Sequence, residues 1–360
     1  MKRFIDIHVP VSNCNLKCHY CYVAQENSFG SEKTEFLYSA DYIGKALSKE
    51  RLGGICHFNM CGIGETLIPE EMIEITKKLL EQGHYILIVT NGTLTKRFEA
   101  FTKFPEELRK RLGFKLSFHY LELKKKNLMN VFVNTVTILK EAGISYTIEM
   151  TPSDELEAYI DEIKEFCKEN FGALPHVTIP RDMTKNEIVL LSKHNLESFV
   201  DTWDTFDSEM LRFKASTWEI KRKDYCYAGK WSGLLNIGTG DFSACYGSKL
   251  SQNIFKNIDK KIDFVAIGNG CKIAHCYNSH SFLALGNIPS IRTTLYSEER
   301  NRIDARDGST WLSEEMNEFL SHRLEDYNTQ HNVLEKYINN CKKVKIYSKK
   351  AIRKIQASVK

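Results

Sequence analysis

Three cysteines stand close together near the start of the sequence, in the stretch SNCNLKCHYCYVAQ. Cys14, Cys18 and Cys21 are separated by three and then two residues. A two-residue spacing lets one tight loop direct two thiolates at the same metal ion or cluster edge. A structural zinc site needs a fourth ligand, and the nearest candidate, His19, stands where the loop is expected to direct it away. A cubane iron–sulfur cluster held by three cysteines keeps one iron open, so we predict a cluster that binds something else.

A second candidate metal set lies farther along the chain and consists of Cys226, Cys245, Cys271 and Cys276. A predicted hairpin connects the first two of these cysteines. The last two are separated by four residues, where two is the usual close spacing, and His275 beside Cys276 is an alternative ligand. A structural zinc ion satisfies the same residues, and unligated packing cysteines are the third interpretation.

An alternation of strand-length and helix-length segments must position these cysteines. The predicted strands are FIDIHVP (4–10), ICHFNM (55–60), HYILIVT (84–90), FKLSFHY (114–120), ISYTIEM (144–150) and HVTIP (176–180). Helical patterns lie between them, and the clearest has Pro69 in its first turn and Gly83 just past its end. Such alternation predicts a parallel sheet with right-handed crossovers. Six units predict an α/β fold with a partial (β/α)6 barrel over residues 1–180.

The rest of the sequence divides into three predicted segments. Residues 181–225 are polar and predict a linker region with one helix. Residues 226–290 carry the second cysteine set, with LLNIGTGDFSACYG as two short strands around a turn, and predict a small C-terminal iron–sulfur α+β domain. Residues 291–360 predict a helical extension with a basic tail, which we interpret as a solvated face.

Composition excludes several classes of protein. The 360 residues carry a net charge of +4, with 42% hydrophobic residues, which is typical of a folded chain and too balanced to indicate nucleic-acid binding. No apolar run reaches the length of about 18 residues that a membrane span needs. Eleven cysteines without a secretory signal argue against a disulfide framework and predict a cytoplasmic protein.

The first cysteine set resembles the signature of radical S-adenosylmethionine (radical SAM) enzymes. The features that carry the resemblance are the Cys14-x-x-x-Cys18-x-x-Cys21 spacing and the aromatic Tyr20 before the last cysteine. Three shorter motifs follow in the family's order, each at the carboxyl end of a predicted strand. They are CGIGETL at 61–67, TNGT at 90–93 and LSFHY at 116–120.

The resemblance implies cofactor-binding roles for five residues. In the loop that resembles the family's Gly-Gly-Glu motif, Gly62, Gly64 and Glu65 are expected to hold the methionine amino group of SAM. Asn91 belongs to the second motif, and Ser117 stands where the family often contacts the SAM ribose or carboxylate. All five fall at the carboxyl ends of predicted strands, where parallel α/β folds build their sites.

The resemblance also implies a reaction. The cysteines are expected to hold a 4Fe-4S cluster whose open iron binds SAM. One electron, from a donor such as flavodoxin or ferredoxin, breaks a carbon–sulfur bond of SAM. The resulting 5′-deoxyadenosyl radical takes hydrogen from the substrate.

The second cysteine set resembles the auxiliary-cluster extension of the same family, in its short twitch form rather than the full SPASM form. This implies a second 4Fe-4S cluster on Cys226, Cys245, Cys271 and Cys276. His119 and Glu149, on predicted strands, are candidates to face the barrel interior, and Cys61 is expected to have a structural role.

Relatives with such extensions mature peptides or oxidise sugars and aminocyclitols. Because the first predicted strand begins almost at residue 1, we expect no leader-peptide-binding domain ahead of it. We therefore predict a small polar or carbohydrate-like substrate. A peptide- or protein-modifying maturase is the second hypothesis, and a non-catalytic metal-binding scaffold is the third.

Overall fold

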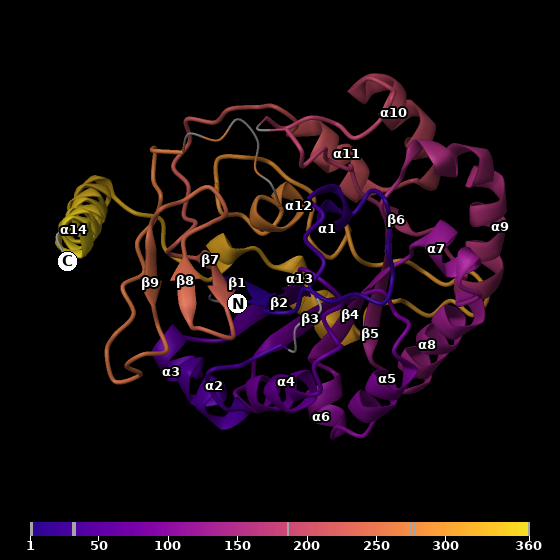
Figure 1. The fold of residues 1–360 in the computed structure, drawn as a ribbon, viewed down its shortest axis with the longest axis horizontal. Coiled ribbons are helices and arrows are strands. Elements are labelled where there is room, and N and C mark those ends of the chain that lie inside the picture. Colours follow the sequence, from indigo (N-terminus) through magenta and orange to yellow (C-terminus); the bar gives the residue numbers. More distant parts are fainter. Residues whose placement is uncertain are drawn as a thin grey trace.

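One mixed sheet forms the centre of the molecule. Figure 1 shows the computed structural model, which describes residues 3–30, 34–185, 187–271, 273, 276 and 278–358, with side chains up to residue 348. The sheet has nine strands in the order β6-β5-β4-β3-β2-β1-β7-β8-β9. Strands β1 to β6 are parallel to their neighbours, and helices of the crossovers cover the outer face. The predicted α/β fold with a partial barrel is confirmed.

All six strands predicted for the barrel are present. The strands are β1 Arg3–Val9, β2 Cys56–Gly62, β3 Tyr85–Thr90, β4 Leu112–Ser117, β5 Ser145–Met150, β6 His176–Val177, β7 Ser232–Asn236, β8 Asp241–Ser243 and β9 Ser251–Asn253. The helices before the second cysteine set are α1 Tyr22–Gln25, α2 Ala40–Ala46, α3 Lys49–Leu52, α4 Glu71–Glu81, α5 Thr95–Thr102, α6 Glu106–Arg109, α7 Tyr120–Lys125, α8 Met129–Glu141, η1 Asp154–Tyr159, α9 Ile160–Phe171, α10 Leu196–Trp203, η2 Asp204–Phe206 and α11 Glu209–Ser216. After it come α12 Ser279–Phe282, α13 Glu314–Ser321, η3 Leu324–Asp326 and α14 Val333–Ser358.

The prediction of one helix in residues 181–225 is wrong, because α10 and α11 are separate helices. Asp207, between them, adopts the left-handed conformation with φ of 50°, which an α-helix does not accommodate. Ser208 then starts α11 as its N-cap, since its hydroxyl accepts a hydrogen bond from the Leu211 amide.

The hairpin predicted for the second cysteine set is present and continues the barrel sheet. Strand β7 pairs in parallel with β1, from Phe4 opposite Ser232 to His8 opposite Asn236. Strands β8 and β9 follow as antiparallel neighbours. Residues 232–253 therefore extend the sheet by three strands beside β1. The predicted domain boundaries stay a prediction.

Residues from the C-terminal third cover the amino ends of the barrel strands. The Tyr85 ring at the start of β3 stacks on Phe319 of α13, with 3.5 Å between ring centroids. Ser145 at the start of β5 hydrogen-bonds Ser313, whose hydroxyl also caps α13. The loops that carry the candidate site accordingly gather at the carboxyl ends of the strands.

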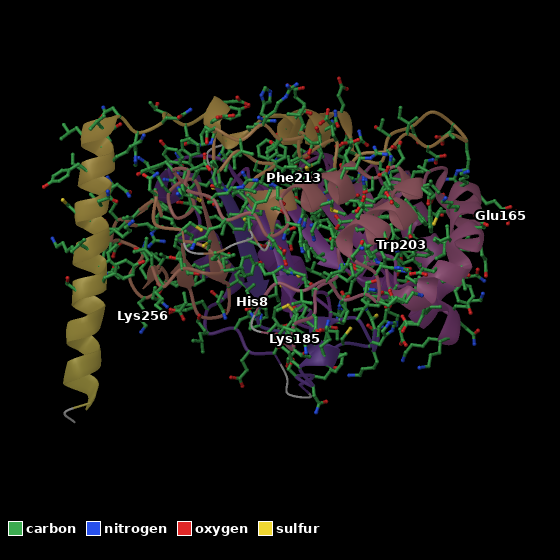
Figure 2. The ribbon with its side chains drawn as sticks, turned by 90° about the horizontal axis from the view of Figure 1, so that it is seen from above. His8, Glu165, Lys185, Trp203, Phe213 and Lys256 are labelled. Atoms are coloured by element: carbon green, nitrogen blue, oxygen red, sulfur yellow. The ribbon has the colours of Figure 1, made fainter. Side chains whose placement is uncertain are left out.

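Helix α14 is longer than the predicted segment NVLEKYINNC and includes most of the basic tail. It stands beyond β9 as a single straight rod at one side of the molecule (Figures 1 and 2). Neither this helix nor any other described one is long and apolar enough to cross a membrane.

Candidate functional site

The three N-terminal cysteines line one cavity at the carboxyl ends of the barrel strands. This cavity holds about 630 Å³ of open space, and the five residues predicted to bind SAM line it as well. The structure therefore brings together the complete predicted set: Cys14, Cys18, Cys21, Gly62, Gly64, Glu65, Asn91 and Ser117. These residues come from the loop after β1 and from the ends of β2, β3 and β4.

The cysteine loop and the loop after β2 are held together through their backbones. The Gly64 amide donates to the Val11 carbonyl at 2.7 Å, and the Glu65 amide donates to the Asn13 carbonyl at 2.8 Å. A Cβ atom on Gly64 would lie 1.9 Å from the Asn13 carbonyl oxygen. Gly64 is therefore required for this close approach, and its amide is already satisfied by the protein.

The carboxylate of Glu65 joins the ends of β2 and β3. Its Oε1 accepts hydrogen bonds from the Thr90 hydroxyl at 2.6 Å and the Leu67 amide at 3.0 Å, and its Oε2 accepts one from the Asn91 amide at 2.8 Å. Burial raises the pKa of Glu65, while these three donors lower it. A carboxylate has about four acceptor positions, so one position remains for a ligand amine.

Cys14 accepts hydrogen bonds that suit a thiolate ligand. The Leu16 amide lies 3.5 Å from its sulfur and the Asn91 side-chain amide lies 3.9 Å from it. Burial raises the thiol pKa of Cys14, Cys18 and Cys21. These thiols lose their protons when they bind a metal, because metal binding requires the deprotonated form.

The geometry of the first set fits a cluster better than a zinc ion. Ligands at about 2.3 Å from a tetrahedral zinc lie about 3.8 Å from one another. Among the described residues, no three cysteines have sulfurs within 4.8 Å of one another. A cubane suits a wider spacing, since each thiolate binds a different iron. His19 pairs instead with Glu155 at 2.9 Å, as expected of a side chain directed away from the cysteines.

The second cysteine set also lines one cavity. Cys226, Cys245, Cys271 and Cys276 are its thiol residues, and most of the remaining wall is apolar, including Ile267. Burial raises the pKa of Cys245 to about 11 and of Cys276 to about 12. Among the described residues, no three of these sulfurs lie within 4.8 Å of one another, whereas the ligands of a tetrahedral zinc lie about 3.8 Å apart, and the metal or cluster at this site stays a prediction. The alternative ligand His275 lies outside the described residues.

A third cavity lies between the two cysteine sets. It shares Tyr22, Cys61 and Gly62 with the first cavity and Tyr246 with the second. Most of its lining residues come from β1, β2, β7 and β8. His8, one of its lining residues, appears in Figure 2 between α14 at one side and α9 at the other. A molecule in this cavity would contact residues beside both cysteine sets.

Asp6 organises the wall of this third cavity. Its Oδ2 accepts hydrogen bonds from the Tyr246 hydroxyl at 2.6 Å and from the Asn278 side chain at 3.1 Å. Its Oδ1 accepts one from Asn59 at 2.8 Å. Tyr246 follows Cys245 in the sequence and Asn278 lies two residues after Cys276, so Asp6 connects the barrel to the segments that carry two of the four cysteines.

Sequence reasoning gave Asp6 no functional role, although a signal was present. Asp6 and His8 alternate with apolar residues in a buried strand, which places two polar side chains on the inner face of the sheet. Tyr246 lies beside a predicted ligand but carries no motif of its own.

Two other predicted interior residues are engaged by the protein itself. Glu149 lies 3.2 Å from Arg300 and 3.6 Å from Lys115 in ion pairs inside the barrel. His119 lines the first cavity and bonds the Tyr20 hydroxyl at 2.7 Å. Burial lowers the pKa of His119 to about 4, so its ring is neutral near pH 7.

Comparisons with known proteins agree with this arrangement. The sequence profile of the radical SAM superfamily matches residues 9–206, more than half of the chain. No curated protein sequence matches the chain significantly.

Solved structures with a related fold include three SAM- or peptide-bound proteins. A histidine-tagged form of anSMEcpe with bound AdoMet is 18% identical, with a TM-score of 0.49, over 72% of this chain and 77% of that chain. SuiB of Streptococcus suis, bound to precursor peptide SuiA, is 17% identical, with a TM-score of 0.50, over 72% of this chain and 65% of that chain. BtrN in complex with AdoMet and 2-DOIA is 16% identical, with a TM-score of 0.30, over 75% of this chain and 78% of that chain. The match thus spans about two-thirds of the SuiB chain, and at these identities the likeness shows the fold alone.

Proposed function

The chain belongs to the radical SAM superfamily, and from this premise we propose that it removes hydrogen from a polar substrate held between two 4Fe-4S clusters. The observation that carries the proposal is the third cavity, which shares lining residues with the cavity of each cysteine set. Family membership makes the protein an enzyme with an iron–sulfur cluster and SAM as cofactors. The second cluster and the substrate are the finer parts of the proposal.

We assign the residues of the first cavity to cofactor binding. Cys14, Cys18 and Cys21 hold the catalytic cluster, and Glu65 offers its remaining acceptor position to the SAM amino group. Ser117 and Asn91 line the space for the rest of SAM, while Gly62 and Gly64 let the loop after β2 pack closely on Val11 and Asn13 of the cysteine loop. When bound, this cluster and SAM supply a 5′-deoxyadenosyl radical that takes hydrogen from an unactivated carbon.

The chemistry of the third cavity selects the substrate class. Two carboxylates, those of Asp6 and Asp241, line it, and no lysine or arginine does among the described residues. An anionic substrate would be repelled there, whereas hydroxyl or amino groups find acceptors. Tyr246, Asn278 and Asn59 fill three of the about four acceptor positions of the Asp6 carboxylate, so one position on Oδ1 remains to accept a hydrogen bond from such a group and to take its proton as the substrate is oxidised. A small hydroxylated or amino-bearing molecule is therefore the leading substrate.

The second cysteine set is proposed to hold the cluster that receives the substrate's electron. Support comes from four half-buried thiols around one largely apolar cavity, no three of whose sulfurs lie within 4.8 Å of one another. The hydrogen bonds from Tyr246 and Asn278 to Asp6 tie this site to the proposed proton acceptor. A cluster held there would accept the substrate's electron beside the carboxylate that takes its proton.

The first experiment measures iron per chain after anaerobic reconstitution, together with 5′-deoxyadenosine formation. We expect about eight irons in the native protein. About four should remain, without SAM cleavage, when Cys14, Cys18 and Cys21 are replaced by alanine. Zinc without iron would refute the proposal, and about four irons falling to none would refute the second cluster alone.

The substrate class is tested by deuterium transfer from candidate substrates to 5′-deoxyadenosine. Deuterium from an aminocyclitol or sugar, and none from phosphorylated analogues, is the expected result. Asp6→Asn should keep iron and SAM binding while product formation falls about a hundredfold or more. Asp161→Asn, an exposed carboxylate on α9, is the matched control and should change neither.

A peptide substrate is the second candidate. What supports it is the fold-level match to SuiB, which was solved with a precursor peptide bound. A serine- or lysine-containing peptide would present the same hydroxyl or amino group to Asp6. Deuterium transfer from a labelled peptide, and not from small molecules, would favour this candidate.

A further inference from the structure

Helix α14 lies against the wall of the four-cysteine site through a small number of specific contacts. The Asn339 side chain both donates to the Ala266 carbonyl and accepts from the Ala266 amide, each at 2.9 Å. Lys343 donates to the Ile267 carbonyl at 2.7 Å. The backbone of Gly268, next in sequence, pairs with Cys226 in both directions. The helix is thereby fixed to residues 266–268, which pair with Cys226 and shortly precede Cys271.

The opposite face of α14 is apolar and exposed. Six large hydrophobic residues on it are between 41% and 87% exposed: Val333, Leu334, Tyr337, Ile338, Val344 and Tyr347. Their spacing follows a helical stripe, so they form one surface rather than scattered contacts. An apolar stripe of this length on a folded protein commonly marks a binding surface.

This stripe lies in strongly basic surroundings. The sequence from 333 to 358 contains eight lysines and arginines and one acidic residue, Glu335. Among the described residues, Lys342 and Lys345 form no salt bridge. The positive charge of the helix is therefore available to a partner.

A groove between α14 and the β8–β9 hairpin extends this basic surface. Ile346 of α14 lines one side of it, and four cations line the other: Arg51, Lys256, Lys260 and Lys261. Its only acidic lining residue in the described part of the chain is Asp263. The groove holds about 1360 Å³ of open space, and Lys256 lies on the side of the molecule nearest α14 in Figure 2.

The groove and the four-cysteine cavity share a thin wall. Gly229 and Ala244 line the groove, whereas their sequence neighbours Ala228 and Cys245 line the cavity. A Cβ atom on Gly229 would lie 2.3 Å from the Val265 carbonyl oxygen, so the backbone segments of this wall pack directly on one another. A molecule seated in the groove is separated from the cysteines by a single layer of backbone.

We propose that α14 and this groove dock a small acidic one-electron carrier protein. The inference rests on the proposed second cluster. One electron passes between the carrier and that cluster, so that one is oxidised as the other is reduced, and no proton or bond is exchanged. An acidic partner complements the unpaired lysines, and a convex protein fits the groove whereas a flat lipid surface does not.

The test measures binding of an acidic flavodoxin to the anaerobic holoenzyme by calorimetry at low and high salt. The variant carries Lys256→Glu, Lys260→Glu and Lys345→Glu. We expect its Kd to rise about tenfold or more and its salt dependence to shrink. The control carries Lys103→Glu, Lys126→Glu and Lys168→Glu, three exposed lysines on the α5, α7 and α9 side of the molecule, and should bind as the native protein does.

Three results would overturn the proposal. They are equal affinities for both triple variants, binding to anionic vesicles of phosphatidylserine in place of flavodoxin, and self-association through α14 in sedimentation. Cleavage of SAM driven by dithionite should be the same in all three proteins. If the native protein fails to cleave SAM with dithionite, the proposed function fails, and the binding data still judge the docking surface separately.

Discussion

Replacing Gly64 with alanine tests how the cysteine loop is held. An alanine Cβ at this position would lie 1.9 Å from the Asn13 carbonyl oxygen and 2.8 Å from the Asn13 nitrogen, both backbone atoms. The two loops must therefore separate, because neither contact can be relieved by rotating a side chain. Separation breaks the Gly64–Val11 and Glu65–Asn13 hydrogen bonds.

The expected cost follows from these contacts. Two backbone hydrogen bonds contribute about 1 kcal/mol each, and residual overpacking adds about 1 kcal/mol or more. The free energy of unfolding should fall by about 3 kcal/mol. The displaced loop should also bind less iron at Cys14, Cys18 and Cys21, and the displaced Glu65 should bind less SAM.

Urea unfolding, iron analysis and SAM calorimetry measure these three effects. Gly143→Ala is the matched control, because its Cβ meets no atom within 4 Å and only the left-handed φ of 65° is strained. The control should lose about 1 kcal/mol and retain its iron and SAM. If Gly64→Ala unfolds like the control and binds SAM normally, the backbone clamp does not hold the site.

Three further predictions concern the scaffold. Phe118→Ala, at a buried position packed against four aromatic rings, should lower the free energy of unfolding by about 4 kcal/mol in urea. Asp304→Asn should lower the free energy of unfolding by about 2 kcal/mol at pH 7. Hydrogen bonds from Arg306 and Lys140 hold the Asp304 pKa below its usual value. The stabilisation by this carboxylate should therefore be complete above about pH 4 and decrease progressively as the pH falls further. Burial lowers the pKa of His84 to about 4, so the unfolded chain binds more protons between pH 4 and 6.5. The free energy of unfolding should fall by up to about 3 kcal/mol as the pH drops through that range. In His84→Gln, the slope of this free energy against pH should correspond to about one proton fewer taken up on unfolding.

Much of the barrel could be predicted because its signals are local. Each strand is a short apolar run and each crossover helix carries its own end signals, such as Gly83 after α4. The boundary between α10 and α11 was missed because one residue, Asp207, adopts a conformation that its polar surroundings do not indicate. The parallel pairing of β7 with β1 was missed for a different reason, since strand pairing over more than 200 residues leaves no local pattern.

The candidate site also has a part that the sequence predicts and a part that depends on the tertiary structure. The sequence by itself determined the metal-binding loop, because Cys14, Cys18 and Cys21 need only a short loop to converge, and it placed Glu65, Asn91 and Ser117 at strand ends that a parallel sheet aligns. Only the tertiary structure decided that one cavity shares lining residues with the cavities of both cysteine sets. It alone joined Asp6 to Tyr246 and Asn278, which lie 240 and 272 residues away along the chain. Contacts of this kind depend on how the whole sheet curves and on which loops cover it, and no local spacing of residues encodes either property.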